Sequence, residues 1–152
     1  MQVGLRTAAW SGDREEQVDW LHYFIMAFSK TVGERRYPEG VTFIPANMFY
    51  SNGGGPVTNV IFPSTLESIG NEAFRYNSMK GREIVIPRRC SSIGIRAFYA
   101  QNCTFVMEGR TMDETRAMSN WPWAAAGNVH EKYVCTDGEI VWQNGAWTNI
   151  PY

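Results

Sequence analysis

The chain has 152 residues, of which 44% are hydrophobic and 19% charged, and its formal net charge is −1. This length fits one domain with a sizeable core, and the composition excludes wholesale disorder and collagen-like structure. The near-neutral net charge argues against binding to nucleic acid or to an anionic membrane that is driven by the overall charge of the protein.

Residues 1–36 predict an N-terminal capping helix. The first ten residues lack a charged start followed by an apolar run, so we expect no signal peptide and a cytoplasmic location. Asp13 and Glu16 form a capping box, and apolar residues at helical spacing extend the helix to about Val32, with Gly33 as its C-terminal residue. The apolar face predicts a buried cap or, alternatively, a dimer or partner surface. It is made by Val18, Trp20, Leu21, Phe24, Ile25, Ala27, Phe28 and Val32. The apolar run 20–28 is too short for the ~20 residues of a bilayer-spanning helix.

Three segments of thirteen residues then align without a gap. They are residues 37–49, 62–74 and 86–98, at offsets of 25 and 24 residues. The columns that they share are Pro38, Pro63 and Pro87, then Ile44, Ile69 and Ile93, then Phe49, Phe74 and Phe98. One such unit cannot bury its own apolar face, whereas stacked units can, so the pattern predicts a solenoid.

One short strand is predicted for each repeat. Alternating apolar residues end at a proline in 60–62 (VIF) and 84–86 (IVI), and a related stretch follows at 105–107 (FVM). If the outer residues of each triplet face the core, then Ile61, Val85 and Val106 face outward in register. This row predicts an apolar patch for a partner or, alternatively, a surface covered by the N-terminal helix or the aromatic C-terminal end.

The sequence of strand, Ile-Pro, polar residues, Ser-Ile-Gly and Ala-Phe resembles the BspA-like class of bacterial leucine-rich repeats. Segments 62–74 and 86–98 match it closely, whereas 37–49 has Pro45 in place of Gly and Met48 in place of Ala, as in a degenerate terminal repeat. The resemblance covers residues 37–110. Segment 109–123 and the CTDG turn at 135–138 are similar to the end of short leucine-rich-repeat proteins encoded by phages and prophages. That resemblance implies a binding scaffold without catalysis.

Residues 111–152 predict a C-terminal cap. Thr111 and Glu114 form a second capping box, for a short helix to about Met118, which Trp121-Pro122-Trp123 ends. Asp-Gly and Asn-Gly turns between apolar stretches predict hairpins. The expected fold is therefore a single α+β domain. It comprises a leucine-rich-repeat solenoid of about three repeats at 37–110, with an N-terminal capping helix in 1–36 and a helix plus β-hairpin cap in 111–152.

No motif typical of an enzyme or a metal site is present. Cys90, Cys103 and Cys135 lack Cys-x-x-Cys spacing and predict free, half-buried thiols. His22 and His130 have no neighbours at metal-ligand spacing, and the glycine-rich stretch 52–56 lacks the Lys-Ser/Thr of a phosphate-binding loop. We expect no catalysis, no metal and no cofactor.

Two further features predict a protein partner. A row rich in Tyr and Asn follows each core Phe and suits adaptable contacts, although Asn and Ser also favour turns whatever the function. Residues 75–96 hold six basic side chains against Glu83, a net +5, and predict docking of an acidic partner, with a solvated face as the alternative and nucleic acid as a weaker one. The partner-binding candidates are Tyr50, Asn52, Arg75, Tyr76, Asn77, Arg82, Arg88, Arg89, Tyr99, Gln101 and Asn102.

The resulting hypothesis is a non-enzymatic protein-binding module of phage or prophage origin. It acts either as a virion component, such as a tail-fibre tip that touches a host surface, or as a small inhibitor of a host defence protein such as a CRISPR nuclease. The first role places the protein in the virion and the second in the cytoplasm of the host cell.

Overall fold

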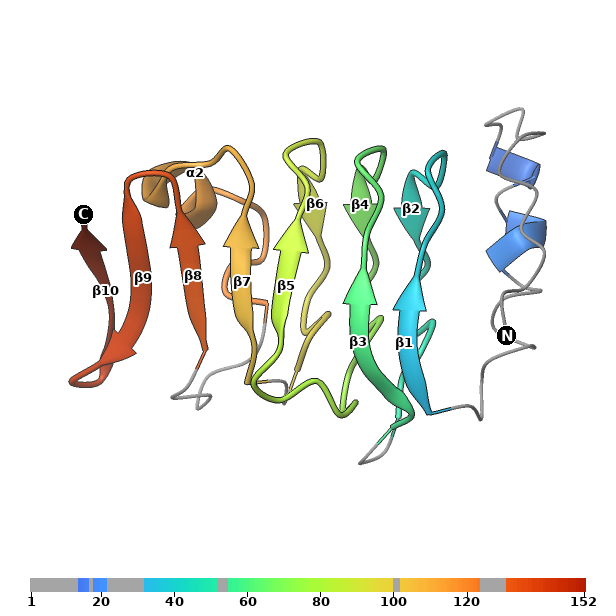
Figure 1. Ribbon diagram of the computed structural model, residues 1–152, viewed down its shortest axis with the longest axis horizontal. Helices are drawn as coiled ribbons and strands as arrows, with labels where there is room; N and C mark the ends of the chain where they lie inside the picture. The colour runs from blue at the N-terminus through green and yellow to red at the C-terminus, as the bar shows by residue number, and fades with distance from the viewer. Residues whose placement is uncertain (1–13, 17, 22–31, 52–54, 100–101, 124–130) are drawn as a thin grey trace.

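The computed structural model describes residues 14–16, 18–21, 32–51, 55–99, 102–123 and 131–152. Over these residues the chain forms a β-solenoid of about four turns, followed by a short helix and antiparallel strands (Figure 1). The predicted class, a short leucine-rich-repeat solenoid, is confirmed. Among the described residues, no helix is both long enough and apolar enough to cross a bilayer.

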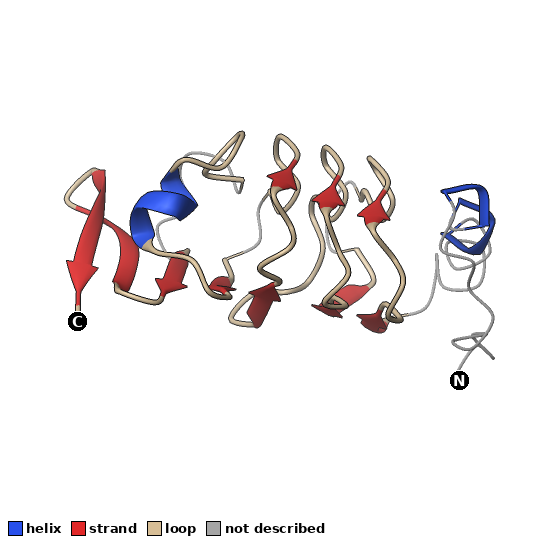
Figure 2. Ribbon diagram, turned by 90° about the horizontal axis from the view of Figure 1, so that it is seen from above, coloured by secondary structure: helices blue, strands red, loops and turns tan. Residues whose placement is uncertain are grey.

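Each of the first three coils contributes one longer and one short strand, which lie in two layers, and the fourth contributes a longer strand (Figure 2). The longer strands are β1 (Gly33–Arg36), β3 (Val57–Ile61), β5 (Glu83–Ile86) and β7 (Thr104–Met107). The short strands are β2 (Phe43–Ile44), β4 (Ser68–Ile69) and β6 (Ser92–Ile93). All strand pairs between these coils are parallel, namely β1 with β3, β5 with β7, β2 with β4, and β4 with β6. A bridge between Ser92 and Ser119 carries the short-strand layer into the fourth coil.

The phenylalanine column is the centre of the core. The rings of Phe49 and Phe74 stack with centroids 6.2 Å apart, and those of Phe74 and Phe98 stack at 5.4 Å. All three are at most 5% exposed. Each buried Phe contributes roughly 1.5–3 kcal/mol and each ring pair about 0.5–1.5 kcal/mol more. The predicted stacking of the three segments is confirmed.

Glycines let the coils approach closely. A Cβ on Gly70 would overlap the backbone of Ala46, and one on Gly94 would overlap the backbone of Asn71 and Gly70. The first coil carries Pro45 at the same position, and β2 is an edge strand of its layer in the described structure. Pro45 is therefore tolerated because, among the described residues, no strand pairs with β2 on that side.

We expect Gly94→Ala to lower the free energy of unfolding by about 1–3 kcal/mol, since the added methyl must displace the backbone of the preceding coil. Thermal and urea unfolding measure the effect. Ser91→Ala, an exposed neighbour, is the control and should stay near wild type. A wild-type unfolding curve for Gly94→Ala would contradict the close packing.

The N-terminal helix is confirmed only in part. Residues 14–16 and 18–21 are helical, Leu21 is 1% exposed, and the Trp20 ring lies 6.3 Å from that of Tyr37 on the first coil. Val32, in contrast, is 74% exposed and outside any helix. Val18 is partly buried against the core, and the other residues of the predicted apolar face lie outside the described residues; they are Phe24, Ile25, Ala27 and Phe28.

The prediction that Gly33 ends the helix is wrong, because Gly33 begins β1. This strand reads GERR and lacks the apolar alternation of the later strands. Arg35 takes the inward position, opposite Val60, and is 2% exposed. Its guanidinium donates to the carbonyl of Gly33 at 3.1 Å and lies 5.0 Å from the Phe49 ring centroid. The first strand therefore lacks the apolar sequence pattern of a strand, because a buried arginine takes the inward position.

The C-terminal cap continues the solenoid sheet. Helix α2 (Met112–Arg116) has the predicted capping box of Thr111 and Glu114. It is followed by β8 (Lys132–Cys135), β9 (Gly138–Gln143) and β10 (Ala146–Pro151). Strand β8 pairs in parallel with β7, β9 pairs antiparallel with β8, and β10 pairs antiparallel with β9. The order of this sheet is therefore β10-β9-β8-β7-β5. The predicted hairpins are confirmed, and they extend the sheet.

Arg116 occupies the open edge of β10. Tyr152 N–H donates to the Asp137 carbonyl at 3.3 Å, so by the alternation of an antiparallel ladder the backbones of Trp147 and Asn149 face the free edge. Arg116 Nη2 donates to the Trp147 carbonyl at 2.9 Å, and its Nε to Asn149 Oδ1 at 2.8 Å. An edge strand with an occupied carbonyl is a poor template for another strand.

We expect Arg116→Ala to increase self-association, since it exposes the Trp147 carbonyl on an unpaired edge. Size-exclusion chromatography with light scattering, over a range of protein concentrations, should give a higher apparent mass than wild type. Arg82→Ala removes the same charge from an exposed loop and serves as the control. Identical masses for Arg116→Ala and wild type would contradict this function of Arg116.

Candidate functional site

The predicted site residues fall on three separate parts of the solenoid. Tyrosines and Arg75 gather after the short strands, Arg88 and Arg89 lie in the turn between β5 and β6, and Ile61, Val85 and Val106 lie on the longer strands. Asn52 and Gln101 lie outside the described residues. The structure therefore offers distinct surfaces.

The first surface is a tyrosine–arginine ridge, defined here as Tyr50, Arg75, Tyr76, Arg96 and Tyr99. The Arg75 guanidinium lies 5.4, 4.8 and 4.9 Å from the ring centroids of Tyr50, Tyr76 and Tyr99. Arg96 lies 5.7 Å from Tyr99, and the rings of Tyr76 and Tyr99 meet edge to face at 5.1 Å. Three successive coils therefore contribute to one continuous ridge.

The turn geometry explains why these side chains meet. Asn47, Glu72 and Arg96 occupy the same place in successive coils and have φ of 59°, 56° and 55°. Tyr50, Arg75 and Tyr99 each follow by three residues, so the repeated turn brings them to the same side. Arg96 contributed to the basic stretch of the sequence but not to the predicted site, because its contact with Tyr99 depends on this left-handed turn.

Arg75 is the electrostatic centre of the ridge. It donates to Glu72 at 2.8 Å, and its side chain is 18% exposed. A hydrogen bond from Arg75 is the main cause that lowers the pKa of the Tyr76 phenol, and the same contact raises the pKa of Arg75. The ridge is thus a preformed group of aromatic rings and guanidinium groups.

Asn77 is buried and does not belong to the binding row that the sequence predicts. It is 8% exposed, donates to the Phe49 carbonyl at 2.7 Å and accepts from the Val57 N–H at 3.1 Å. Asn102 is half-buried and its Oδ1 is shielded from solvent. Asn77 therefore links the first coil to the second and does not present a surface to a partner, which is the turn chemistry that the sequence left as the alternative.

Ion pairs reduce the net charge of the predicted basic face. Arg75, Arg88 and Arg89 form ion pairs with Glu72, Glu114 and Glu67, at 2.8, 3.1 and 3.2 Å. All three acids lie outside the stretch 75–96, so the net +5 of that stretch becomes +2 when these three neighbours are counted. Arg82 remains exposed in the loop before β5. The pairs of Arg88 and Arg89 could not be predicted from the sequence, because their partners lie 26 and 22 residues away, whereas Glu72 lies in the same turn as Arg75.

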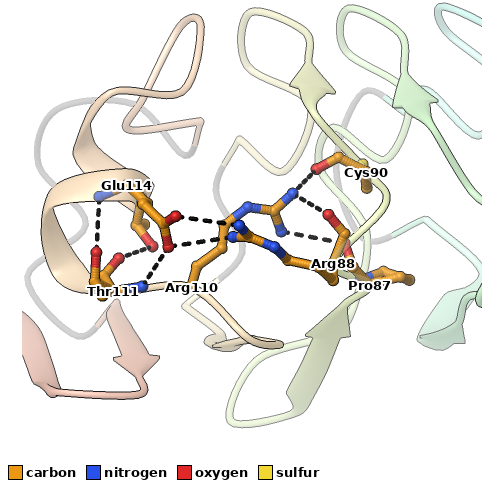
Figure 3. Close-up of polar contacts among 7 residues, drawn as sticks. Pro87, Arg88, Cys90, Arg110, Thr111 and Glu114 are labelled. Atoms are coloured by element: carbon orange, nitrogen blue, oxygen red, sulfur yellow. Dashed lines mark hydrogen bonds and ion pairs between the residues drawn. The ribbon is translucent and has the colours of Figure 1, made fainter.

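Hydrogen bonds and an ion pair stabilise the turn that contains Arg88 (Figure 3). Arg110 is 5% exposed and donates to the carbonyls of Pro87, Arg88 and Cys90 at 3.1, 2.6 and 2.5 Å. Arg88 pairs with both oxygens of Glu114, which also accepts from the Thr111 N–H. An open depression of about 450 Å³ lies beside this network. Since Arg110 holds three turn carbonyls, we assign it a structural role.

The second surface is an apolar row on the solvent side of the sheet. Val85, Val106 and Val134 are register partners on β5, β7 and β8, and Val85 is 43% exposed. The next register partner is Glu139, which separates the three valines from Ile150, a residue that is 40% exposed. The predicted register of Val85 and Val106 is confirmed, and the described residues do not cover Val85.

Ile61 departs from the predicted register. It lies on β3, which pairs with β1 and not with β5. Val134 and Ile150 were missed by sequence reasoning, because the parallel pairing of β8 with β7 joins segments far apart in the chain. The apolar row is therefore longer on its C-terminal side than the sequence predicts.

The described residues contain no group of three His, Cys, Asp or Glu side chains that could hold a metal ion. Cys90, Cys103 and Cys135 are free and, contrary to the half-buried expectation, fully buried. Burial raises the pKa of Cys90 to about 11 and that of Cys103 to about 12. Thiols that stay protonated are weak nucleophiles.

Glu131 is a carboxyl group within the core. It is 2% exposed, its Oε1 accepts a hydrogen bond from Tyr133, and its Oε2 has no hydrogen-bond partner among the described residues. Burial is the main cause that raises its pKa from the ordinary 4.5 to about 8. Because its side chain is sealed from solvent, Glu131 affects stability and does not meet a substrate.

We expect the wild-type free energy of unfolding to fall as pH rises from about 4.5 to about 8, because the unfolded chain releases the Glu131 proton first. Glu131→Gln should lose this slope. Between pH 4 and pH 8 its free energy of unfolding should therefore rise, relative to that of wild type, by at most roughly 3–5 kcal/mol. Urea unfolding across this range measures it. Glu108→Gln, on the surface, should keep the wild-type slope, and a wild-type slope in Glu131→Gln would refute the assignment.

Parallel coils with recurrent Ile and Phe columns define the class of the protein, a leucine-rich-repeat solenoid. The family model of the BspA type leucine rich repeat region (6 copies) matches residues 25–115, more than half of the chain. The chain belongs to this family. No curated protein and no solved structure matches it.

Proposed function

We propose that the protein is a non-enzymatic module that binds a protein partner through the apolar row of its sheet. The family is typically a binding scaffold. The observation that carries the proposal is the alignment of Val85, Val106 and Val134 on three hydrogen-bonded strands, facing away from the core. Exposed apolar residues that are contiguous and held rigid are typical of interaction surfaces.

The polar rim supports the same proposal. Lys132 and Glu139 form an ion pair at 3.0 Å beside the apolar row, and Glu83 and Thr104 lie on the same face. A central apolar stripe with charged residues around it is the usual composition of a non-obligate interface. The partner is therefore expected to bring an apolar stripe of its own.

We infer a phage or prophage origin from the resemblance of segment 109–123 and the CTDG turn. Two roles follow as alternatives. In the first, the module is part of a virion, such as a tail-fibre tip that contacts a host surface. In the second, it is a small inhibitor that binds a host defence protein such as a CRISPR nuclease.

Affinity capture from a bacterial lysate, followed by mass spectrometry, tests the sheet face. Val85→Glu should lose at least about tenfold of the captured partner, since a charge in an apolar contact costs more than 1.4 kcal/mol. Ile95→Glu is the matched control, because Ile95 is 54% exposed in the turn after β6. Loss of the partner in Ile95→Glu alone would move the contact away from the sheet and overturn the proposal.

Light scattering and particle association separate the two roles. A tail-fibre component is expected to form trimers and to co-sediment with virions. A monomer or dimer that co-purifies with a nuclease favours the inhibitor. Reproducible catalytic turnover by the purified protein would contradict both.

A further inference from the structure

We propose that the tyrosine–arginine ridge is a second docking surface, which takes an acidic segment of a polypeptide. The ridge follows the short strands, whereas the apolar row lies on the longer strands of the other layer. The inference is therefore independent of the sheet contact. It rests on the arrangement of the five ridge residues and on the charges near them.

The ridge is preorganised for binding. Tyr50, Arg75 and Tyr99 come from three coils whose backbones are hydrogen-bonded to one another at this point, with Ser51 N–H donating to the Arg75 carbonyl at 3.1 Å and Tyr76 N–H to the Tyr99 carbonyl at 3.0 Å. Tyr50 is 41% exposed and the other tyrosines are half-buried. Tyr and Arg held on a rigid backbone lose little conformational entropy on binding, and both are typical of interface hot spots.

The ridge presents hydrogen-bond donors. Arg75 covers a face of each tyrosine, and Arg96 also lies over Tyr99. The ring faces are thus partly occupied. Since Arg75 and Tyr99 hydrogen-bond to Tyr76, the Tyr50 phenol and the Arg96 guanidinium supply the donors for an anion. Single-stranded nucleic acid binds through open ring faces on which bases stack, so the covered rings favour a carboxylate-bearing peptide.

The surrounding charge has the sign that an acidic segment requires. Within the described part of the chain, Arg96 forms no ion pair, and neither do Lys80 and Arg82 in the exposed loop that follows the ridge. Glu72 is the acid at the ridge, and Arg75 neutralises it. Three cations remain against Glu83, the exposed acid next to Arg82, and this net positive charge attracts carboxylates.

Fluorescence anisotropy with three short labelled probes tests the proposal: a peptide that alternates Glu and Gly, its Lys and Gly counterpart, and oligo-dT. At low ionic strength the acidic peptide should bind at least about tenfold more tightly than the other two. Arg96→Glu should weaken that binding at least about tenfold, and Tyr50→Phe should weaken it several-fold by removing one hydroxyl. Arg89→Glu, which makes the same charge change in another turn, should bind within about twofold of wild type.

Arg96→Glu is expected to fold, because Glu72 holds the same repeat position with φ of 56° against 55° for Arg96. A circular dichroism melt checks each variant, and Arg96→Gln replaces Arg96→Glu if its melting temperature falls. The proposal is overturned if the acidic peptide does not bind, if oligo-dT binds as tightly, or if the loss in Arg89→Glu equals that in Arg96→Glu. Failure here would leave the Val85→Glu experiment unaffected.

Discussion

Close approach of successive coils is the constraint on which the whole molecule depends. Parallel backbones hydrogen-bond from coil to coil in both layers, and Phe49 N–H also donates to the Ala73 carbonyl in the intervening turn, at 2.7 Å. At this separation each side chain meets its own counterpart in the next coil. Gly70 and Gly94 make the approach sterically acceptable, and the stacked phenylalanines provide the apolar contact that stabilises it.

The same repetition that fills the core also arranges the surface. Val85 and Val106 align because their strands pair, and the ridge tyrosines align because their turns share one geometry. The residues between these rows mainly serve the fold, since Asn77 and Arg110 bond to turn carbonyls. A partner therefore meets chemistry arranged in lines along the solenoid axis, with the two surfaces on different layers.

Sequence patterns predicted what is encoded locally. The Thr111 capping box and the Asn-Gly hairpin were predicted because a few neighbouring residues determine each of them, and the Phe column because its repeat unit recurs at a nearly constant spacing. Strand β1 was not predicted, because Arg35 stands where later strands have an aliphatic residue. The pairing of β8 with β7 and the neutralisation of Arg88 by Glu114 were missed because both join distant segments. The sequence thus predicted which residue types form the candidate sites better than it predicted where these residues lie in the fold and what they contact.

The left-handed position of each turn has a consequence for how such a scaffold diversifies. Asn47, Glu72 and Arg96 place an amide, a carboxylate and a guanidinium on the same backbone conformation. The conformational energy cost of a positive φ in a non-glycine residue is already offset there by contacts of the surrounding coil. One codon change at this position can therefore reverse the local charge without repacking the interior, so that the protein can acquire a new binding preference while its architecture stays intact.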